Sequence, residues 1–253
     1  MQRAAPRVAI AVIAKAPRPG HVKTRLQGIL RPEEAASLGA AFLRDTLDNL
    51  VEAARYAPID PFVAYAPKGE EARFDGVLPE GVRLVLADGT DGDGPGVEGF
   101  GRVLLHATRA LFAEGYAAIC LLNADSPTLP TAELVQAVRL LLDGAQDAVF
   151  GPADDGGYWL IGLKAPYTEP YARIAWSTEA VAGTTRTRLR ETGLRVAELA
   201  TWYDVDNPPA LLRLDAELSG RAAPGAVPFP APRTAALMRS LGIAARLLPA
   251  SAP

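Results

Sequence analysis

The sequence predicts an α/β fold in which helices cover both faces of a mostly parallel sheet. Two fully apolar runs, Val8–Ile13 and Ala117–Leu122, have the length and composition of buried strands. Segments with the apolar spacing of helices alternate with further short strand candidates along the chain. With 253 residues, 49% of them hydrophobic and 22% charged, the chain is long and apolar enough to bury such a core.

The first half of the chain begins with the Val8–Ile13 strand. Pro32, followed by Glu33 and Glu34, predicts a helix start, because proline fits the first turn and acidic side chains favour the positive end of the helix dipole. This helix is expected to reach about Ala54. The elements expected next are strands at Phe62–Ala66 and Val82–Ala87, a Gly- and Asp-rich loop at Gly89–Gly101, and a helix at Arg102–Glu114.

The second half of the chain continues the alternation after the Ala117–Leu122 strand. A helix is expected at Thr131–Leu142 with Thr131 as its cap, and another, capped by Ser177 or Thr178, is expected to reach about Thr192. The remaining expected elements are strands at Ala148–Phe150, Tyr158–Leu163 and Val196–Leu199, and a helix from Pro208 to about Leu218.

We expect one domain over residues 1–253, with a core at about 7–218. Residues 219–253 are expected to form an extended tail, because Gly220–Pro232 is rich in Pro, Ala and Gly. A last short helix, Thr234–Leu241, is expected to dock back on the domain. No internal repeat is present.

Composition argues against several functional classes. The net charge of −3 does not suit a general binder of nucleic acids or anionic membranes. The single cysteine excludes an intramolecular disulfide and a Cys-based zinc site. The longest apolar runs are far shorter than a membrane span, and Val8–Ala14 is too short for a signal peptide. We therefore expect a cytoplasmic monomer or homodimer with neither a nucleic-acid nor a membrane partner.

The stretch IAKAPRPGHVKTRL, residues 13–26, concentrates positive charge. It holds two of the four lysines of the chain, Lys15 and Lys23, together with Arg18 and Arg25. No Asp or Glu precedes Glu33, whereas seven Arg and Lys residues do. The N-terminal segment is therefore a local basic patch on a mildly acidic protein.

The same stretch contains two prolines and a glycine, so it cannot form one regular helix. It follows a predicted strand, and ligands of open α/β sheets bind beyond the carboxyl ends of the strands. We expect a phosphate-binding loop that Pro17 and Pro19 hold rigid and that Gly20 allows a ligand to approach closely. The stretch matches neither the Walker motif nor the dinucleotide fingerprint. The alternative is a solvated basic loop without a ligand.

Three further polar loops follow predicted strands. They read NADSPTLP after Ala117–Leu122, GPADDGGYW after Ala148–Phe150, and WYDVDNPP after Val196–Leu199. Asp, Asn, Gly and Pro are ordinary turn residues, so each loop taken alone is explained as a turn. Together the loops favour one site, in which Asp125, Asp204 and Asp206 supply the oxygen ligands that Mg²⁺ or Mn²⁺ prefers.

The motifs AKAPRPGHVKTRL, NADSPTLP, GPADDGGYWLIGL, AWSTEAV and DVDNPPAL occur in the order typical of one bacterial family. The chain resembles the glycosyltransferase-like DUF2064 family, some of whose members are linked to arsenosugar biosynthesis or to radical-SAM gene neighbourhoods. It is more distantly similar to 2-phospholactate guanylyltransferase. The resemblance covers roughly Val8–Leu218 and implies a GT-A-like nucleotide-diphospho-sugar transferase fold: a three-layer α/β/α sandwich around a mostly parallel mixed sheet, with a divalent-metal site.

The resemblance and the motifs together assign roles to individual residues. The residues assigned to nucleotide and phosphate binding are Lys15, Lys23, Arg25, Gly20, Thr24 and Asn123. The residues assigned to metal binding are Asp125, Asp206 and Asp204. The acceptor base is Asp155 or Asp154, because the acidic turn is not needed for the metal, and the acceptor contacts Gly156, Gly157, Tyr158 and Trp176. The usual family pattern Gly-Thr-Asp-Cys-Pro reads Asn-Ala-Asp-Ser-Pro here, residues 123–127, so a threonine hydroxyl and a cysteine are replaced.

Three functions fit these residues. The first is a metal-dependent transferase that moves a sugar from a nucleotide-diphospho-sugar to a small acceptor. The second is a nucleotidyltransferase that joins a nucleoside triphosphate to a phosphorylated small molecule and releases pyrophosphate; the few glycines of the first loop speak against it. The third is a non-catalytic nucleotide-binding module, favoured if the replacements around Asp125 abolish metal binding. The expected partners are a nucleotide or nucleotide-sugar and a small-molecule acceptor.

Overall fold

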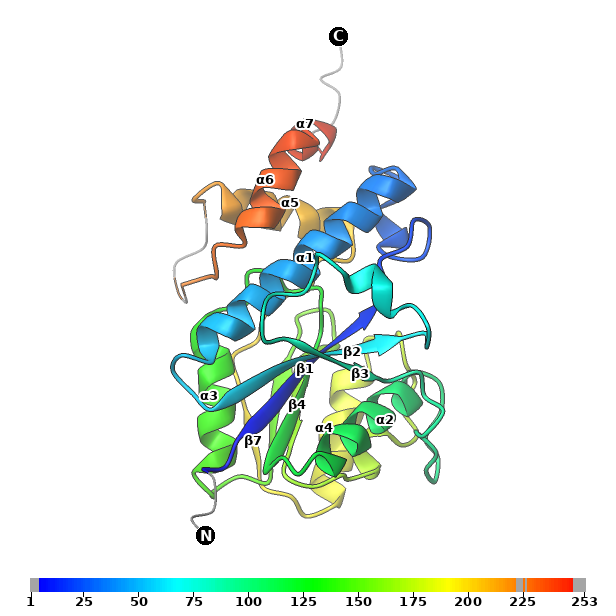
Figure 1. The fold of residues 1–253 in the computed structure, drawn as a ribbon, viewed down its shortest axis with the longest axis vertical. Helices are drawn as coiled ribbons and strands as arrows, with labels where there is room; N and C mark the ends of the chain where they lie inside the picture. The colour runs from blue at the N-terminus through cyan, green and yellow to red at the C-terminus, as the bar shows by residue number, and fades with distance from the viewer. Residues whose placement is uncertain (1–4, 222–224, 226, 248–253) are drawn as a thin grey trace.

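The centre of the computed structural model, which describes residues 5–221, 225 and 227–247, is a mixed sheet (Figure 1). Its seven strands lie in the order β3-β2-β1-β4-β6-β5-β7. Only β6 runs antiparallel to its neighbours in this sheet, and the other pairs are parallel. The sheet confirms the predicted mostly parallel α/β fold. The strands are β1 (Val8–Lys15), β2 (Ile59–Ala66), β3 (Arg83–Leu86), β4 (Ala118–Leu122), β5 (Ala148–Pro152), β6 (Tyr158–Leu163) and β7 (Val196–Glu198).

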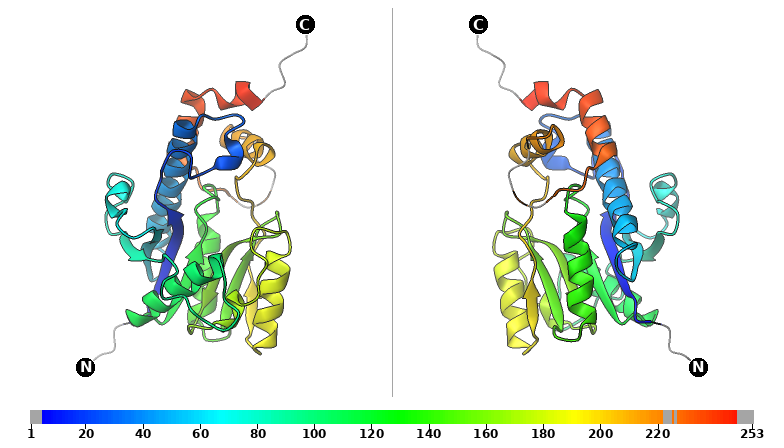
Figure 2. Two further views of the ribbon diagram at one scale, coloured as in Figure 1. Left: turned by 90° about the vertical axis from the view of Figure 1, so that its right-hand side faces the viewer. Right: turned by 90° about the vertical axis from the view of Figure 1, so that its left-hand side faces the viewer.

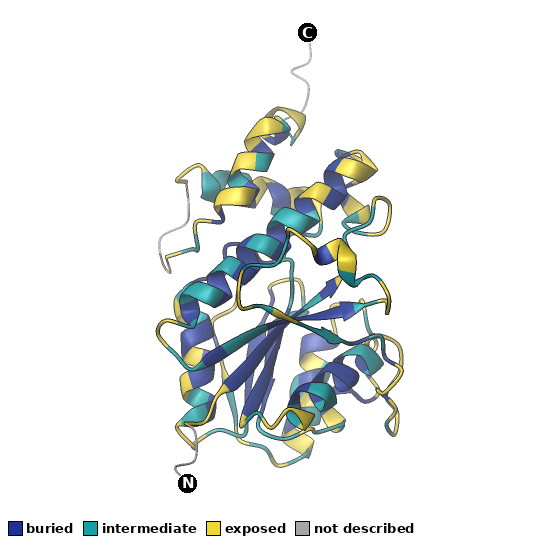
Figure 3. Cartoon of the chain, in the orientation of Figure 1, coloured by how far each residue is buried: buried dark blue, intermediate teal, exposed yellow. Residues whose placement is uncertain are grey.

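Helices cover both faces of the sheet, and alternate residues of β1 show why. Val8, Ile10 and Val12 pack on the face covered by α1 (Pro32–Ala53) and α3 (Thr131–Leu142). Ala9 and Ala11 pack on the face covered by α2 (Phe100–Ala113) and α4 (Val181–Glu191). Because both faces of β1 are buried, its residues from Val8 to Ala14 are all apolar (Figure 3), and only the last residue, Lys15, is charged and exposed.

The C-terminal helices form a third packed group above the end of the sheet. They are α5 (Pro208–Leu218), α6 (Pro232–Ser240) and α7 (Ile243–Leu247), and they stand at the top of Figure 1 and of both views in Figure 2. They pack on the first half of α1 through Leu38, Phe42, Met238 and Ile243. The expected last helix therefore exists and packs on α1, which supports our proposal of one domain. Part of the expected extended tail lies outside the described residues.

Two expected helix caps are wrong. Helix α3 begins at Thr131, but its cap is Pro130, and Thr131 Oγ1 instead donates to Asn49 Oδ1 at 2.6 Å. Helix α4 begins at Val181 with Ala180 as its cap, two residues later than a cap at Thr178 would give and three later than a cap at Ser177. The sequence also gave no sign of the short 3₁₀ helices η1 (Thr24–Leu26), η2 (Glu71–Phe74) and η3 (Glu169–Tyr171).

The strand directions place four loops at one edge of the sheet. Strands β1, β4 and β5 end at this edge, and β6 begins there because it is antiparallel, so that Tyr158 lies beside Pro152. No helix in the described part of the chain has both the length and the apolar content needed to cross a membrane.

Candidate functional site

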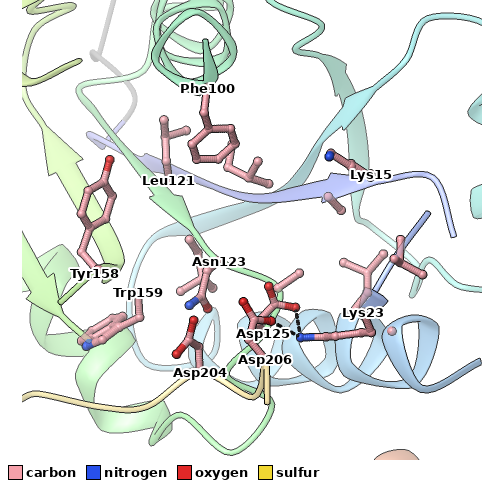
Figure 4. A pocket seen from close by; sticks show the side chains of 18 of the residues that line it. Lys15, Lys23, Phe100, Leu121, Asn123, Asp125, Tyr158, Trp159, Asp204 and Asp206 are labelled. Atoms are coloured by element: carbon pink, nitrogen blue, oxygen red, sulfur yellow. Dashed lines mark hydrogen bonds and ion pairs between the residues drawn. The ribbon is translucent and has the colours of Figure 1, made fainter. Parts of the chain in front are cut away.

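A cavity of about 400 Å³ opens at this edge of the sheet (Figure 4). All four polar loops of the sequence contribute to its wall, together with α1 and α2. The first loop contributes Lys15, Pro17, His21, Val22 and Lys23; the second contributes Asn123, Ala124 and Asp125; the third contributes Gly157 and Tyr158; the fourth contributes Asp204 and Asp206.

Lys23 lies among the carboxylates on one side of the cavity. Its Nζ is 2.5 Å from Asp125 Oδ1 and 3.0 Å from Asp206 Oδ1, and it donates to the carbonyl of Val205 at 2.8 Å. The side chain is 4% exposed, and Nζ lies 4.9 Å from the ring centroid of Phe42. Burial opposes the positive charge of Lys23, but the charges and hydrogen bonds of the two aspartates outweigh it and raise its pKa. Its ammonium therefore binds carboxylates in this structure, whereas the sequence assigned it to phosphate.

The backbone explains how Lys23 reaches this position. Lys23 adopts a left-handed conformation, with φ of 49°, immediately before η1, and this turns the chain across the mouth of the sheet. Gly39 of α1 lies beside this loop; a Cβ there would be 3.6 Å from Val22 Cγ2, an ordinary contact, so the approach of the loop does not depend on glycine.

The segment carrying Asp204 and Asp206 is fastened to the loop after β4. The N–H of Val205 donates to the carbonyl of Asp125 at 2.8 Å, and Ser126 Oγ donates to the carbonyl of Tyr203 at 2.8 Å. Ser126, which replaces the cysteine of the usual family pattern, thus holds two polar loops together.

The oxygen atoms on this side suit a divalent cation in their chemistry. Asn123 Oδ1 is buried and accepts no hydrogen bond within the described chain. Burial, followed by the charges of Asp155, Asp206 and Asp125, raises the pKa of Asp204 to about 7, and no cation among the causes of this shift opposes it. Even so, no three His, Cys, Asp or Glu side chains in the described ranges are arranged to hold a metal ion. The donor set fits Mg²⁺ or Mn²⁺, while the present arrangement holds an ammonium.

The other basic-loop residues lie farther out. Lys15 is exposed, lines the cavity and has no ion-pair partner within residues 5–221 and 227–247. The Arg25 side chain is 64% exposed, with Nη1 4.0 Å from Asp206 Oδ2. Three residues assigned to phosphate binding do not belong to the cavity wall: Arg25, Thr24 and Gly20. The structure thus brings Lys15 and Lys23 to the cavity and leaves the other three at its margin.

The two aspartates of the acidic turn differ in their partners. Asp154 Oδ2 accepts from Arg213 Nη1 at 2.6 Å. Asp155 is exposed, and its Oδ1 accepts from the N–H of Gly157 at 2.8 Å. Neither lines the cavity, but Asp155 is close enough for its charge to affect Asp204. Gly156 has a φ of 89°, so this turn requires glycine.

The opposite side of the cavity is apolar, and none of the sequence motifs predicted this. Figure 4 shows Phe100 reaching from α2 toward Leu121 of β4. Phe100 is 43% exposed and meets Trp176 edge to face, with ring centroids 5.4 Å apart. Trp176 does not line the cavity, but its Nε1 donates to the carbonyl of Glu98 at 3.2 Å. One feature of the sequence could have indicated this wall. Phe100 lies between two glycines at the start of a helix, where it belongs to no buried strand and to no buried face of a helix.

Comparison with known proteins agrees with this architecture. The model of the family "Uncharacterized protein conserved in bacteria (DUF2064)" matches residues 46–178, just over half of the chain. No curated protein is significantly similar in sequence. A crystal structure of a provisionally named nucleotide-diphospho-sugar transferase from Desulfovibrio desulfuricans G20 is 27% identical over 96% of this chain and 97% of that chain, with a TM-score of 0.77.

More distant structures share the fold. The structure of CMP:2-keto-3-deoxy-manno-octonic acid synthetase complexed with CTP has a TM-score of 0.54 at 10% identity, covering 85% of this chain and 99% of that one. Glucosyl-3-phosphoglycerate synthase from Mycobacterium tuberculosis, in complex with Mn²⁺, UDP and glucosyl-3-phosphoglycerate, has a TM-score of 0.50 at 13% identity, covering 86% and 80%. The fold is therefore the GT-A-like nucleotide-diphospho-sugar transferase fold that the motifs implied.

Proposed function

The chain belongs to the DUF2064 family, and we propose that it is a transferase that takes a nucleotide-diphospho-sugar as donor and moves the sugar to a small acceptor. The observation that carries the proposal is the convergence of a basic loop and three aspartates on one cavity at the carboxyl edge of the sheet. The similarity to the Desulfovibrio protein supports the same class of donor.

The polar side of the cavity is assigned to the donor diphosphate. Lys15 lines it as an exposed cation without an ion-pair partner among the described residues, and Arg25 stands at its margin. Asp125, Asp204 and Asp206, with Asn123, would hold Mg²⁺ or Mn²⁺. When bound, the ion would neutralise charge that develops on the leaving diphosphate.

The acceptor is assigned to the side formed by the acidic turn and the aromatic residues. Asp155 is the proposed base, because Arg213 already neutralises Asp154. Gly157 and Tyr158 line the cavity beside this turn, and Phe100 adds an apolar wall that Trp176 supports edge to face. These residues would place an acceptor hydroxyl near the donor sugar and exclude water from it.

The test is a thermal-shift panel of nucleoside diphosphates, triphosphates and nucleotide-sugars with Mg²⁺ or Mn²⁺, followed by product analysis with candidate acceptors. The proposal expects stabilisation by nucleoside diphosphates and nucleotide-sugars, and release of a nucleoside diphosphate on transfer. Release of pyrophosphate from a triphosphate and a phosphorylated acceptor would instead establish a nucleotidyltransferase. Binding without any turnover of donor would indicate the non-catalytic module.

A further inference from the structure

The Asp125–Asp206 pair already has a cation. Lys23 bridges the two carboxylates at 2.5 Å and 3.0 Å, and its third acceptor is the carbonyl of Val205 at 2.8 Å. An ammonium has three N–H donors, so each of them has a partner and none is left for a phosphate oxygen. In this arrangement Lys23 cannot serve the donor diphosphate.

The same contacts prevent the pair from serving a metal ion. A divalent ion bound by Asp125 and Asp206 needs the oxygen atoms that face Lys23, and two cations held by the same carboxylates repel each other strongly in a buried site. Oxygen donors line the cavity, but the described residues hold no ready group of three ligating side chains, so these side chains must rearrange to hold a metal ion.

We infer that Lys23 and a divalent cation are alternative partners of the Asp125–Asp206 pair, so that Mg²⁺ or Mn²⁺ enters the site by displacing the Lys23 ammonium. Lys23 lines the cavity, and it stands on a loop rather than on a strand. A long flexible side chain in that place can leave the carboxylates without disturbing the sheet. Once displaced, its charge becomes available to an anion in the cavity.

The exchange of Lys23 for a divalent ion changes the charge on this side of the cavity. With Lys23 in place, its charge is already paired with Asp125 and Asp206, so this side of the cavity has no excess of positive charge to attract a diphosphate. A divalent ion adds positive charge and releases a lysine toward the substrate. The site therefore becomes attractive to a diphosphate only after the metal has entered. The inference depends on the proposed function only through the metal.

The experiment measures Mn²⁺ binding by the full chain without any nucleotide, using the electron paramagnetic resonance signal of free Mn²⁺. Four proteins are compared: wild type, Lys23→Met, Lys23→Arg and Lys15→Met. Methionine is unbranched and only one atom shorter than lysine, so it keeps most of the Lys23 side chain and removes its charge. Lys15→Met removes one charge from the same cavity without touching the carboxylate pair, so it controls for the general loss of positive charge.

Lys23→Met should bind Mn²⁺ about tenfold or more tightly than wild type, because the competing partner no longer occupies the site. Lys23→Arg, which keeps a competing charge, should stay close to wild type, and Lys15→Met should change the affinity far less than Lys23→Met. Mn²⁺ should also raise the melting temperature of Lys23→Met more than that of wild type. If Lys23→Met folds only with Mn²⁺ present, that rescue shows the same exchange.

Equal Mn²⁺ affinity of wild type and Lys23→Met would overturn the inference, and so would an equal gain in Lys15→Met. Both results leave a metal-dependent transferase intact, because wild type then binds the ion without an exchange. If neither wild type nor Lys23→Met binds Mn²⁺, the inference fails together with the proposed metal, while the nucleotide panel still tests the transferase itself.

Discussion

Asp154 and Asp155 are adjacent in the chain but are not equivalent. Arg213 holds Asp154 at 2.6 Å, whereas Asp155 keeps one oxygen free of protein partners in the described structure. Asp155→Asn should therefore slow transfer about a hundredfold or more, since the base is lost, while nucleotide affinity stays near normal. Turnover and nucleotide affinity, measured on the same preparation, check this.

Asp154→Asn is the matched control, because it changes the neighbouring carboxylate in the same turn. It should reduce turnover much less than Asp155→Asn does. If Asp155→Asn loses nucleotide binding as well as turnover, the acidic turn belongs to the nucleotide side of the cavity and the acceptor assignment is wrong.

Lys15 is the other lysine of the basic loop, and its position suits a ligand contact. It is exposed at the cavity wall and has no ion pair within the described residues. Lys15→Ala should weaken binding of a nucleoside diphosphate by about 2 kcal/mol, the typical loss for a hydrogen bond to a charged group. Calorimetry with UDP or GDP, whichever the panel selects, measures it. An unchanged affinity, with an unchanged melting temperature, would remove Lys15 from the phosphate site.

Sequence reasoning found the residue types of the site but not their partners. Lys15 and Lys23 look alike in the stretch AKAPRPGHVKTRL, and both were expected to bind phosphate. Which lysine pairs with Asp125 and Asp206 depends on the left-handed turn at Lys23 and on the fold that brings the two distant aspartates to it. Such pairing across the fold is set by tertiary packing, which local motifs do not encode.

Helix α6 is attached to α1 by a buried carboxylate. Asp45 accepts from the backbone N–H groups of Arg233 at 3.2 Å and Thr234 at 2.7 Å, so it caps the first turn of α6 from another helix. Asp45→Ala leaves these donors without partners and should lower the free energy of unfolding by about 1–3 kcal/mol. Denaturant unfolding measures the loss, and hydrogen exchange should rise in residues 232–247.

Asp48→Ala is the control for this contact. Asp48 is partly exposed and pairs with Arg44 and Arg233, so its loss should cost less than about 1 kcal/mol. Equal losses in the two variants would show that charge, rather than the buried cap, attaches α6.

The short edge strand β7 is held by a charged pair at its start. Arg195 Nε and Nη2 donate to Asp147 at 2.9 Å and 3.0 Å, and these contacts lower the pKa of Asp147 to about 2. Because the pKa of Asp147 is lower in the folded state than in the unfolded state, the ion pair stabilises the fold above about pH 4, the ordinary pKa of an aspartate. This stabilisation is lost as the pH falls through 2.

The difference in melting temperature between wild type and Asp147→Asn should therefore stay constant from pH 7 to pH 5. It should narrow as the pH falls below about 4, because the pair then weakens in wild type as well. A difference that widens toward acid would show that another group controls this edge of the sheet.

At the level of elements, the strands and the long helices could be predicted from the sequence, whereas the short helices could not. The apolar runs gave β1 and β4, and α5 runs from Pro208 to Leu218 as expected. The cap of α3 escaped prediction because Thr131 binds Asn49 of a distant helix, and the 3₁₀ helices escaped because three or four residues are too few to show an apolar period. Helix α7 was missed for a related reason: its five residues are stabilised by packing on α5 and α6 rather than by their own periodicity.

Across the whole molecule, the cavity joins segments that are far apart in the chain. Its walls come from the loop after β1, the loop after β4, the start of β6 and residues 204–206. The common edge of these loops could be predicted from the sequence, because parallel strands of one sheet end on the same side. The apolar wall with Phe100 could not be foreseen, because it depends on how α2 lies across β4.

A cavity built from distant segments couples ligand binding to the stability of the whole fold. A ligand that binds only the folded chain stabilises it by about 2.7 kcal/mol when its concentration is one hundred times its dissociation constant. For a chain of this size, that corresponds to a rise in melting temperature of about 5–10 °C.

We expect this rise in melting temperature with a nucleoside diphosphate and Mg²⁺ or Mn²⁺ together. Because the cavity without the ion has no excess of positive charge to hold the diphosphate, chelator should remove most of the rise. Hydrogen exchange should slow at the loop after β1, the loop after β4 and residues 204–206 at once. An equal rise in chelator would show that the nucleotide binds without the ion, and protection confined to one segment would place the nucleotide outside the shared cavity.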